Sequence, residues 1–206
     1  HYVYKNDEIF SNIYFKYKNN NPAINSVRLI DDDIYTLNVA PPDRFIISCN
    51  ENGYFSIWNS DKYGFNNSDD IWENSEIDII LIGDSFTEGA CVHYDQNIKA
   101  HLKKNNYKIL NLGNGGSGTI NHIGLIREYS KEFNKINYVI LLYYVFDIQD
   151  LVREIENDIT KQYYLNTNFS QNLIDKKEFI KSEMDKKVDN FIKSQIFYDK
   201  NWGKPF

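Results

Sequence analysis

Three shortages narrow what this 206-residue chain can be. Its two cysteines, Cys49 and Cys91, are too few for a disulfide framework or a cysteine-based metal site. The two could pair with each other, but a chain of this length buries a core without a covalent cross-link, so we expect two unpaired thiols. No apolar run approaches the roughly 18–20 residues of a membrane span. The chain has a net charge of −6 and therefore lacks the excess of basic residues that binding to nucleic acid requires.

The chain also lacks an initiating methionine, because it begins at His1. We therefore expect a processed or trimmed product, and any signal peptide or membrane anchor would lie before His1. What is present describes a folded protein: hydrophobic residues make up 42% and aromatic residues 16%. That composition is typical of a globular chain with one sizeable core.

Residues 1–70 are aromatic and polar, and predict a small β-rich N-terminal extension. Short strand patterns occur at 45–48 and 54–58. Between them, Glu51, Asn52 and Gly53 form a turn signal, so the two strands predict a hairpin.

Residues 71–206 predict an α/β domain. Nearly continuous apolar runs at 77–82, 107–112 and 138–143 are typical of strands buried on both faces. Their starts are about thirty residues apart, the length of a strand–helix–strand unit, which predicts a parallel sheet with helices on both faces. The intervening and following segments predict helices at 96–104, 120–133, 148–164 and 176–196. In the last of these, the stripe Ile180, Met184, Val188, Phe191 and Ile196 favours core packing over a cofactor site.

In an open parallel sheet, sites form beyond the carboxyl ends of the strands. The first strand is followed by Gly83, Asp84 and Ser85. The sequence allows two interpretations of Ser85. It is either a helix N-cap, with Glu88 three residues later as in a capping box, or a nucleophile at a helix start where free N–H groups stabilise an oxyanion.

The second strand is followed by GNGGSG at 113–118, four glycines in six residues. Such a loop lets backbone approach a ligand closely. No lysine follows it, and the first strand–helix turn lacks the dinucleotide glycine pattern, so a phosphate or nucleotide site is disfavoured. A backbone N–H from this loop would suit an oxyanion hole beside Ser85.

These blocks resemble the SGNH (GDSL-type) hydrolases. GDSF at 83–86 and NLG at 111–113, running to Gly116, look like the first two blocks of that family. DKYGFNN at 61–67, LIREY at 125–129 and DIQDL at 147–151 look like a bacterial subgroup with the same layout. The resemblance spans about residues 54–172. It implies a three-layer α/β/α flavodoxin-like fold and a serine esterase or acyl transferase that needs no cofactor or metal.

Carried over by position, the resemblance implies that Ser85 is the nucleophile. The backbone N–H groups of Ser85 and Gly116 would be two oxyanion donors. The family's third donor is an asparagine at the end of the third strand, and Phe146 stands there in this chain. A phenylalanine donates nothing, which would cost roughly 3–4 kcal/mol of transition-state stabilisation. Asn114 could supply an amide instead.

The general base of the family is a histidine in a DxxH pair near the C-terminus, and this chain has no such pair. His93 and His122 follow the first and second strands and could reach the site, while His101 falls on a helix. For each of them an ordinary solvated or hydrogen-bonded histidine is favoured. One expectation is that the protein continues past Phe206, or that internal segments after about residue 172 are absent from this sequence. In either case the missing part would carry the catalytic histidine and further strands. Alternatively, the chain has kept the scaffold and lost the triad.

The expected function is therefore a serine esterase or O-acyl transferase acting on an ester, with acetyl groups of a cell-envelope carbohydrate as preferred substrate. The competing hypothesis is a catalytically inactive SGNH-like module that binds a glycan or a partner protein. The type of substrate favours an extracytoplasmic location.

Overall fold

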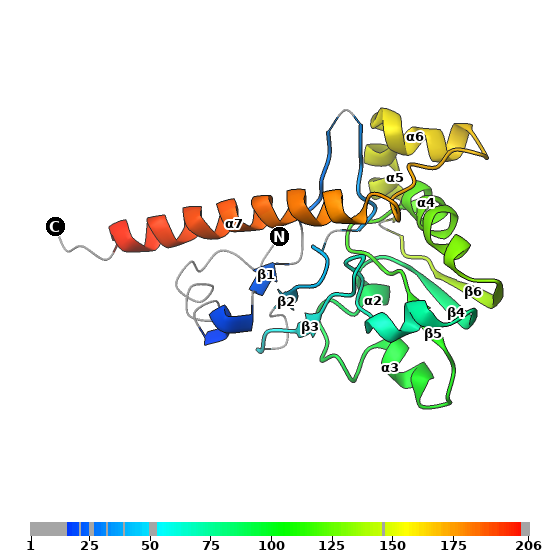
Figure 1. Cartoon of the computed structure of the whole chain (residues 1–206), viewed down its shortest axis with the longest axis horizontal. Coiled ribbons are helices and arrows are strands. Elements are labelled where there is room, and N and C mark those ends of the chain that lie inside the picture. The colour runs from blue at the N-terminus through cyan, green and yellow to red at the C-terminus, as the bar shows by residue number, and fades with distance from the viewer. Residues whose placement is uncertain are drawn as a thin grey trace.

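The computed structural model describes residues 16–20, 22–24, 27–31, 33–38, 40–49, 53–145 and 147–202, with the side chains of residues 24 and 194–202 outside the description. Over these ranges the chain is a mixed α/β protein (Figure 1). No helix in the described ranges combines the length and the apolar character that a bilayer crossing requires.

The central element is a parallel sheet of three strands, β4 (Glu76–Gly83), β5 (Ile109–Asn111) and β6 (Lys135–Leu142). Their order is β5-β4-β6, with Ile79 opposite Ile109 and Tyr138. The three apolar runs therefore predicted the strands and their parallel pairing correctly. The first crossover runs from the central strand β4 out to β5, and the second runs from β5 past β4 to β6 on the other side.

Helices connect and follow these strands. They are α2 (Ser85–Glu88), α3 (Ile98–Lys103), α4 (Thr119–Tyr129), α5 (Asp147–Glu156), α6 (Asp158–Leu165) and α7 (Lys177–Trp202), with short 3₁₀ turns η1 (Lys18–Asn20), η2 (Asp69–Glu73) and η3 (Ser130–Glu132). The single helix predicted over 148–164 is two helices. The break falls at Asn157, whose side chain accepts the N–H groups of Ile159 and Thr160 and so starts a new helix.

Strand β4 is covered on both faces by different helices. Ile80 and Ile82 belong to the same buried cluster as Leu125 of α4. Ile79 and Leu81 form a second cluster with Leu102 of α3. Alternate side chains of a strand point to opposite faces, so α3 and α4 lie on opposite sides of the sheet, as two right-handed crossovers require. The predicted α/β class is confirmed.

Strand β6 differs from its prediction. Its run of apolar residues predicted burial on both faces, yet Tyr138 is 67% exposed and Leu141 is 49% exposed. Among the described residues no strand pairs with the outer edge of β6. The prediction was wrong here because an apolar run shows only that a strand is suited to burial. Whether the strand is buried depends on other segments that pack against it, and the run carries no information about those.

The N-terminal region forms a small mixed sheet of β1 (Pro22–Ile24), β2 (Phe45–Ile47) and β3 (Ile57–Asn59). Strands β2 and β3 are antiparallel with Ile46 opposite Trp58, which confirms the predicted hairpin. Residues 51 and 52 of its tip lie outside the described residues. Strand β1 pairs parallel to β2 and carried no signal in the sequence.

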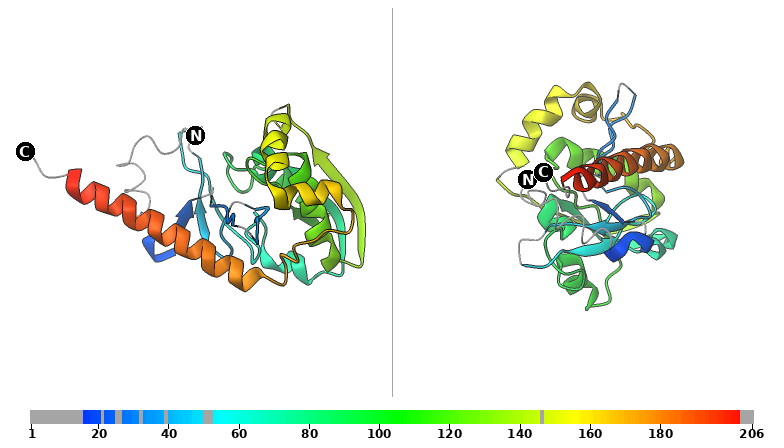
Figure 2. Two further views of the ribbon diagram at one scale, coloured as in Figure 1. Left: turned by 90° about the horizontal axis from the view of Figure 1, so that it is seen from above. Right: turned by 90° about the vertical axis from the view of Figure 1, so that its left-hand side faces the viewer.

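Helix α7 packs on the N-terminal region, although its sequence was assigned to the α/β domain (Figure 2). The Arg44 Nε lies 2.8 Å from Asp185 Oδ1. Ile180, Met184 and Val188 are buried as predicted, and Ile196 falls outside the described side chains. Buried residues on both sides of the expected boundary at 70 form one hydrophobic cluster, so the core is continuous across it.

The two cysteines form a disulfide, and the prediction of unpaired thiols was wrong. Cys49 follows β2 and Cys91 follows α2, with 5.2 Å between their Cα atoms. A neighbouring hydrogen bond of 2.7 Å from the Ser56 hydroxyl to the Val92 carbonyl holds the same two segments together. The 42-residue separation gave no sign of this contact, which the tertiary fold creates.

Candidate active site

Ser85 lies at the sharp turn between β4 and α2. Gly83 ends the strand, and a side-chain carbon there would lie 2.1 Å from Thr87 Oγ1 and 2.6 Å from the Leu142 carbonyl oxygen. Only glycine fits between α2 and the neighbouring strand at that distance. The tight turn brings Ser85 to the carboxyl end of the sheet, half-exposed at the first position of the helix.

The helix cap is Asp84, and Ser85 does not provide it. The Asp84 carboxylate accepts the N–H of Phe86 at 2.9 Å. The capping-box interpretation of Ser85 with Glu88 is therefore wrong. The Ser85 hydroxyl makes no hydrogen bond to another described residue, so it remains available to a ligand.

The glycine loop packs directly on α2. A side-chain carbon on Gly113 would lie 2.3 Å from the backbone nitrogen of Glu88, so the loop approaches the helix more closely than any other residue would permit. A carbon on Gly115 would lie 3.7 Å from the Ser85 Cβ, whereas one on Gly116 would meet no atom within 4 Å. The structure thus brings Ser85 and the loop together and leaves Gly116 beside open space.

Asparagine side chains join the separate motif blocks. The Asn111 amide donates to the Thr87 carbonyl at 2.8 Å, and its oxygen accepts the Gly113 N–H at 2.8 Å. Asn67 makes two hydrogen bonds of 3.0 Å to the Asn111 backbone. The Asn66 amide donates to the Glu88 carbonyl at 2.9 Å. The block at 61–67 therefore supports both the serine helix and the start of the glycine loop.

The same block is anchored by Asp61, which is 1% exposed. Its carboxylate accepts backbone N–H groups of Tyr63 and Phe65 and side-chain N–H groups of Asn67 and Trp72, at 2.8–3.0 Å. Burial raises the pKa of Asp61 to about 6, and these four donors offset part of that effect.

The far end of the glycine loop is held by Glu154 of α5. This carboxylate is 2% exposed and accepts the N–H groups of Gly118, Ile120 and Asn121 at 2.6, 2.9 and 3.2 Å. It thereby caps α4, whose own N-cap residue, Gly118, has no side chain. Burial raises the pKa of Glu154, against these three donors. Sequence reasoning missed this residue because nothing local links positions 36 residues apart.

His122 lies behind the site and is 3% exposed. The carbonyls of Gly83 and Ser117 and the carboxylate of Asp147 face its ring, but neither ring nitrogen has a hydrogen bond of good geometry to a described residue. Burial lowers the pKa of His122, more than these neighbours raise it. The ring is therefore neutral at pH 7 and is enclosed between the end of β4 and the glycine loop.

The other described histidines lie elsewhere. His93 Nδ1 is 2.6 Å from Asp95 Oδ1 at the protein surface. His101 is exposed on α3, with its Nδ1 3.4 Å from the Lys104 amine. Within the described chain, no hydrogen bond joins a histidine to Ser85.

Asn114 lies within the described residues, whereas Phe146 does not. The Asn114 amide donates to the Leu37 carbonyl, and Asn114 is 2% exposed. This contact lets the amide support the loop, and the oxyanion role of Asn114 stays a prediction. Phe146 lies outside the described residues, so its correspondence to the family asparagine stays a prediction.

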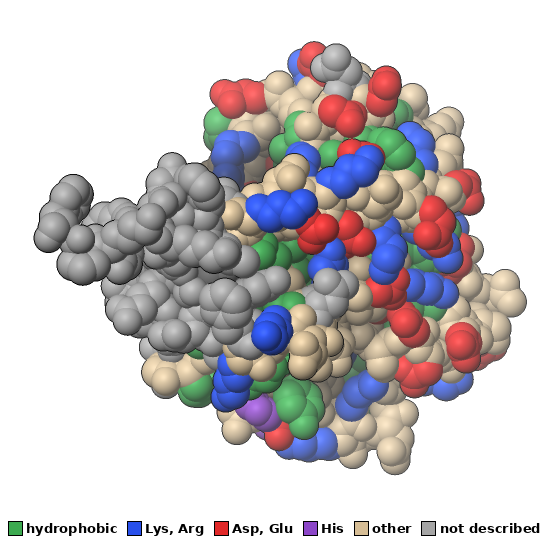
Figure 3. Space-filling view, turned by 60° about the vertical axis from the view of Figure 1, so that its left-hand side comes forward, with side chains coloured by type: hydrophobic (Ala, Val, Ile, Leu, Met, Phe, Trp, Pro, Cys, Tyr) green, Lys and Arg blue, Asp and Glu red, His purple; other side chains and the backbone are tan. Residues whose placement is uncertain are grey.

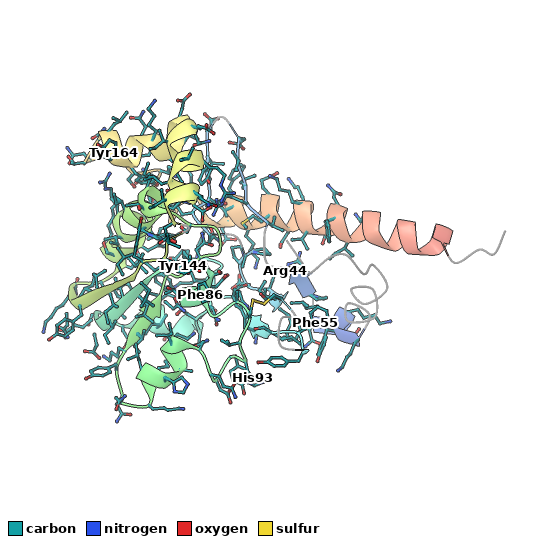
Figure 4. The ribbon with its side chains drawn as sticks, turned by 180° about the vertical axis from the view of Figure 1, so that it is seen from behind. Arg44, Phe55, Phe86, His93, Tyr144 and Tyr164 are labelled. Carbon is teal, nitrogen blue, oxygen red and sulfur yellow. A yellow bond between two sulfur atoms is a disulfide. The ribbon has the colours of Figure 1, made fainter. Side chains whose placement is uncertain are left out.

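An aromatic pair lies next to the serine. Phe86 and Tyr144 make an edge contact with ring centroids 5.3 Å apart, and they are 65% and 41% exposed (Figure 4). Phe86 directly follows Ser85, and Tyr144 follows β6. These two rings form an exposed apolar surface beside Ser85.

The described residues contain no group of three or more His, Cys, Asp or Glu side chains that could hold a metal ion. The chain matches none of the family models, curated proteins or solved structures with which it was compared. The resemblance to the SGNH hydrolases therefore rests on the ordered motif blocks.

Proposed function

We propose that this chain is a serine esterase or O-acyl transferase with the flavodoxin-like fold of the SGNH hydrolases. The observation that carries the proposal lies at the start of α2. There Asp84 caps the helix, and the Ser85 hydroxyl has no hydrogen-bond partner in the described chain. A serine needed only for helix capping would occupy the position that Asp84 holds.

In the proposed reaction the Ser85 Oγ attacks the ester carbonyl carbon. A histidine from outside the described residues takes the hydroxyl proton and returns it to the departing alcohol as the ester C–O bond breaks. The backbone N–H groups of Ser85 and Gly116 stabilise the intermediate oxyanion. Water or a sugar hydroxyl then cleaves the acyl-enzyme. The preferred substrate is an acetyl ester of a cell-envelope carbohydrate.

An extracytoplasmic location fits this substrate. The Cys49–Cys91 disulfide supports it, since disulfides form and persist in oxidising compartments.

The test is hydrolysis of p-nitrophenyl acetate by the complete protein and by its Ser85→Ala variant, together with labelling by a fluorophosphonate probe. We expect Ser85→Ala to abolish both signals. Ser68→Ala serves as the control, because Ser68 also lies at the start of a helical turn and makes no side-chain cap hydrogen bond. Equal rates for the complete protein and its Ser85→Ala variant would refute the proposal.

The placement of the histidines favours a second candidate, a catalytically inactive module that binds a glycan or a protein partner. His93 is bonded to Asp95, and His122 is enclosed, so the described chain offers Ser85 no base. This candidate predicts no labelling of Ser85 by the probe, and robust labelling would rule it out.

A further inference from the structure

A cavity of about 760 Å³ lies between the small N-terminal sheet and α3. Its volume is within the range of pockets that hold small ligands. It is lined by the β2–β3 hairpin, by the segments at 66–68 and 93–95 and by one side of α3, whereas Ser85 and the glycine loop take no part in its wall. It is therefore separate from the candidate active site.

One wall of this cavity is aromatic. Phe45, Phe55 and Trp58 come from the hairpin, and Tyr17 and Tyr94 complete the wall. Tyr17 and Phe45 lie with ring centroids 5.0 Å apart, and Tyr94 is 60% exposed. Flat, amphipathic rings of this kind pack against the C–H faces of sugar rings while leaving the sugar hydroxyls in water.

The opposite side is basic. Lys99, Lys103 and Lys104 line it, and Asp95 is the acidic residue among the lining side chains. Asp95 already pairs with His93, and no carboxylate in the described chain lies within ion-pair distance of the three lysines. Figure 3 shows blue basic side chains beside green hydrophobic ones and a purple histidine low on this face. On a chain of net charge −6, this is a local excess of positive charge.

Lys99 is the most enclosed of the three. Its amine donates to the Asn66 carbonyl, and burial, followed by the charge of Lys103, lowers its pKa to about 8. A bound anion would offset the cost of keeping these ammonium groups close together with little water.

The cavity walls are held before any ligand binds. The Cys49–Cys91 disulfide and the hydrogen bond from Ser56 to Val92 join the hairpin to the segment that carries His93 and Tyr94. Figure 4 shows Phe55 and His93 on neighbouring segments at this end of the molecule. A preformed site of this kind spends little binding free energy on ordering its walls.

We propose that this cavity binds an anionic carbohydrate, with a sugar ring stacked on the aromatic wall and its carboxylate or phosphate group held by Lys99, Lys103 and Lys104. The proposal does not rest on the chemistry of Ser85. A neutral sugar would leave the lysines unpaired, and a nucleic acid strand would meet the overall negative charge of the chain.

The experiment is isothermal titration calorimetry with the full chain and four probes: trigalacturonate, glucose 6-phosphate, neutral maltotriose and a thymidine hexanucleotide. The first two distinguish a carboxylate from a phosphate. We expect at least one of these two anionic sugars to bind. Maltotriose should bind with an affinity lower by roughly tenfold or more, which is the effect of losing a charge-assisted hydrogen bond. We expect Ser85→Ala to bind as the unmodified chain does.

Two variants test the walls. The double variant Lys99→Gln, Lys103→Gln should weaken binding roughly tenfold or more, and Tyr94→Ala should weaken it about threefold to tenfold. Lys135→Gln is the matched control, because Lys135 is exposed on β6 and does not line the cavity, and it should bind within about twofold of the unmodified chain. Circular dichroism checks that each variant is folded.

Four results would overturn the proposal: no binding of either anionic sugar at millimolar concentration, equal binding of maltotriose, tighter binding of the hexanucleotide, or unchanged binding by the folded double lysine variant. Loss of binding in Ser85→Ala would contradict the assignment of the ligand to this cavity. None of these results depends on whether the chain hydrolyses esters, so the two proposals can fail separately.

Discussion

The buried carboxylate of Asp61 should make the stability of this protein depend on pH in an identifiable way. Burial raises its pKa from the ordinary 3.8 to about 6 in the folded state. The folded state therefore holds the Asp61 proton more tightly than the unfolded state does. The resulting stabilisation is fully present below pH 3.8 and is lost as the pH rises through about 6.

The magnitude follows from the two pKa values. A shift of about two units corresponds to about 3 kcal/mol in total, since each unit is worth about 1.4 kcal/mol. Part of this change in the free energy of unfolding occurs below about pH 4.5, outside the interval used for the measurement. Between about pH 4.5 and 7.5, linkage leaves a loss of about 2 kcal/mol in the free energy of unfolding.

The assay is urea unfolding of the unmodified chain and of Asp61→Asn at several pH values in that interval. The asparagine in Asp61→Asn does not titrate, and its amide NH₂ would face the N–H donors of Asn67 and Trp72. The variant should therefore be less stable than the unmodified chain at every pH in this interval. The difference between the two proteins should shrink by about 2 kcal/mol as the pH rises. Asp70→Asn, at an exposed position nearby, corrects for the general loss of one carboxylate. A difference that stays constant, or grows with pH, would refute the reasoning.

Three further predictions concern the supports of the site. Glu154→Ala leaves three helix N–H groups without their acceptor and should lower the free energy of unfolding by about 3 kcal/mol in urea titrations, whereas Glu156→Ala, exposed on the same helix, should change it little. Gly83→Ala introduces a carbon 2.1 Å from a neighbouring oxygen and should abolish fluorophosphonate labelling; full labelling would show that the turn adapts. Replacing both Cys49 and Cys91 by alanine should cost about 4 kcal/mol, the value for a loop of this length, and an unchanged melting temperature would contradict it.

The sequence predicted the parts of the fold whose signals are local. The apolar runs marked three parallel strands, and turn residues marked the hairpin between β2 and β3. Because sites form beyond the carboxyl ends of parallel strands, the sequence predicted that Ser85 lies beside the glycine loop. In the structure a side-chain carbon on Gly115 would lie 3.7 Å from the Ser85 Cβ. These results follow from periodicity and from chain connectivity alone.

The remaining features depend on contacts between distant segments. The cap on α4 comes from Glu154 on another helix, and the disulfide joins residues 42 positions apart. Helix α7 has an ordinary apolar stripe, which predicts burial but does not say against which part of the chain. For the same reason the role of Asp84 was overlooked: aspartate and serine both cap helices, and only the geometry shows which one does so here.

The outer edge of β6, with which no described strand pairs, has a consequence for the chemistry proposed at Ser85. Leu142, at the carboxyl end of β6, pairs with Gly83, two residues before the serine. Any strand added in parallel along β6 would end at this same rim and would deliver the loop that follows it toward Phe86 and Tyr144. A catalytic group could thus reach the serine by extension of the sheet, with no rearrangement of the described residues.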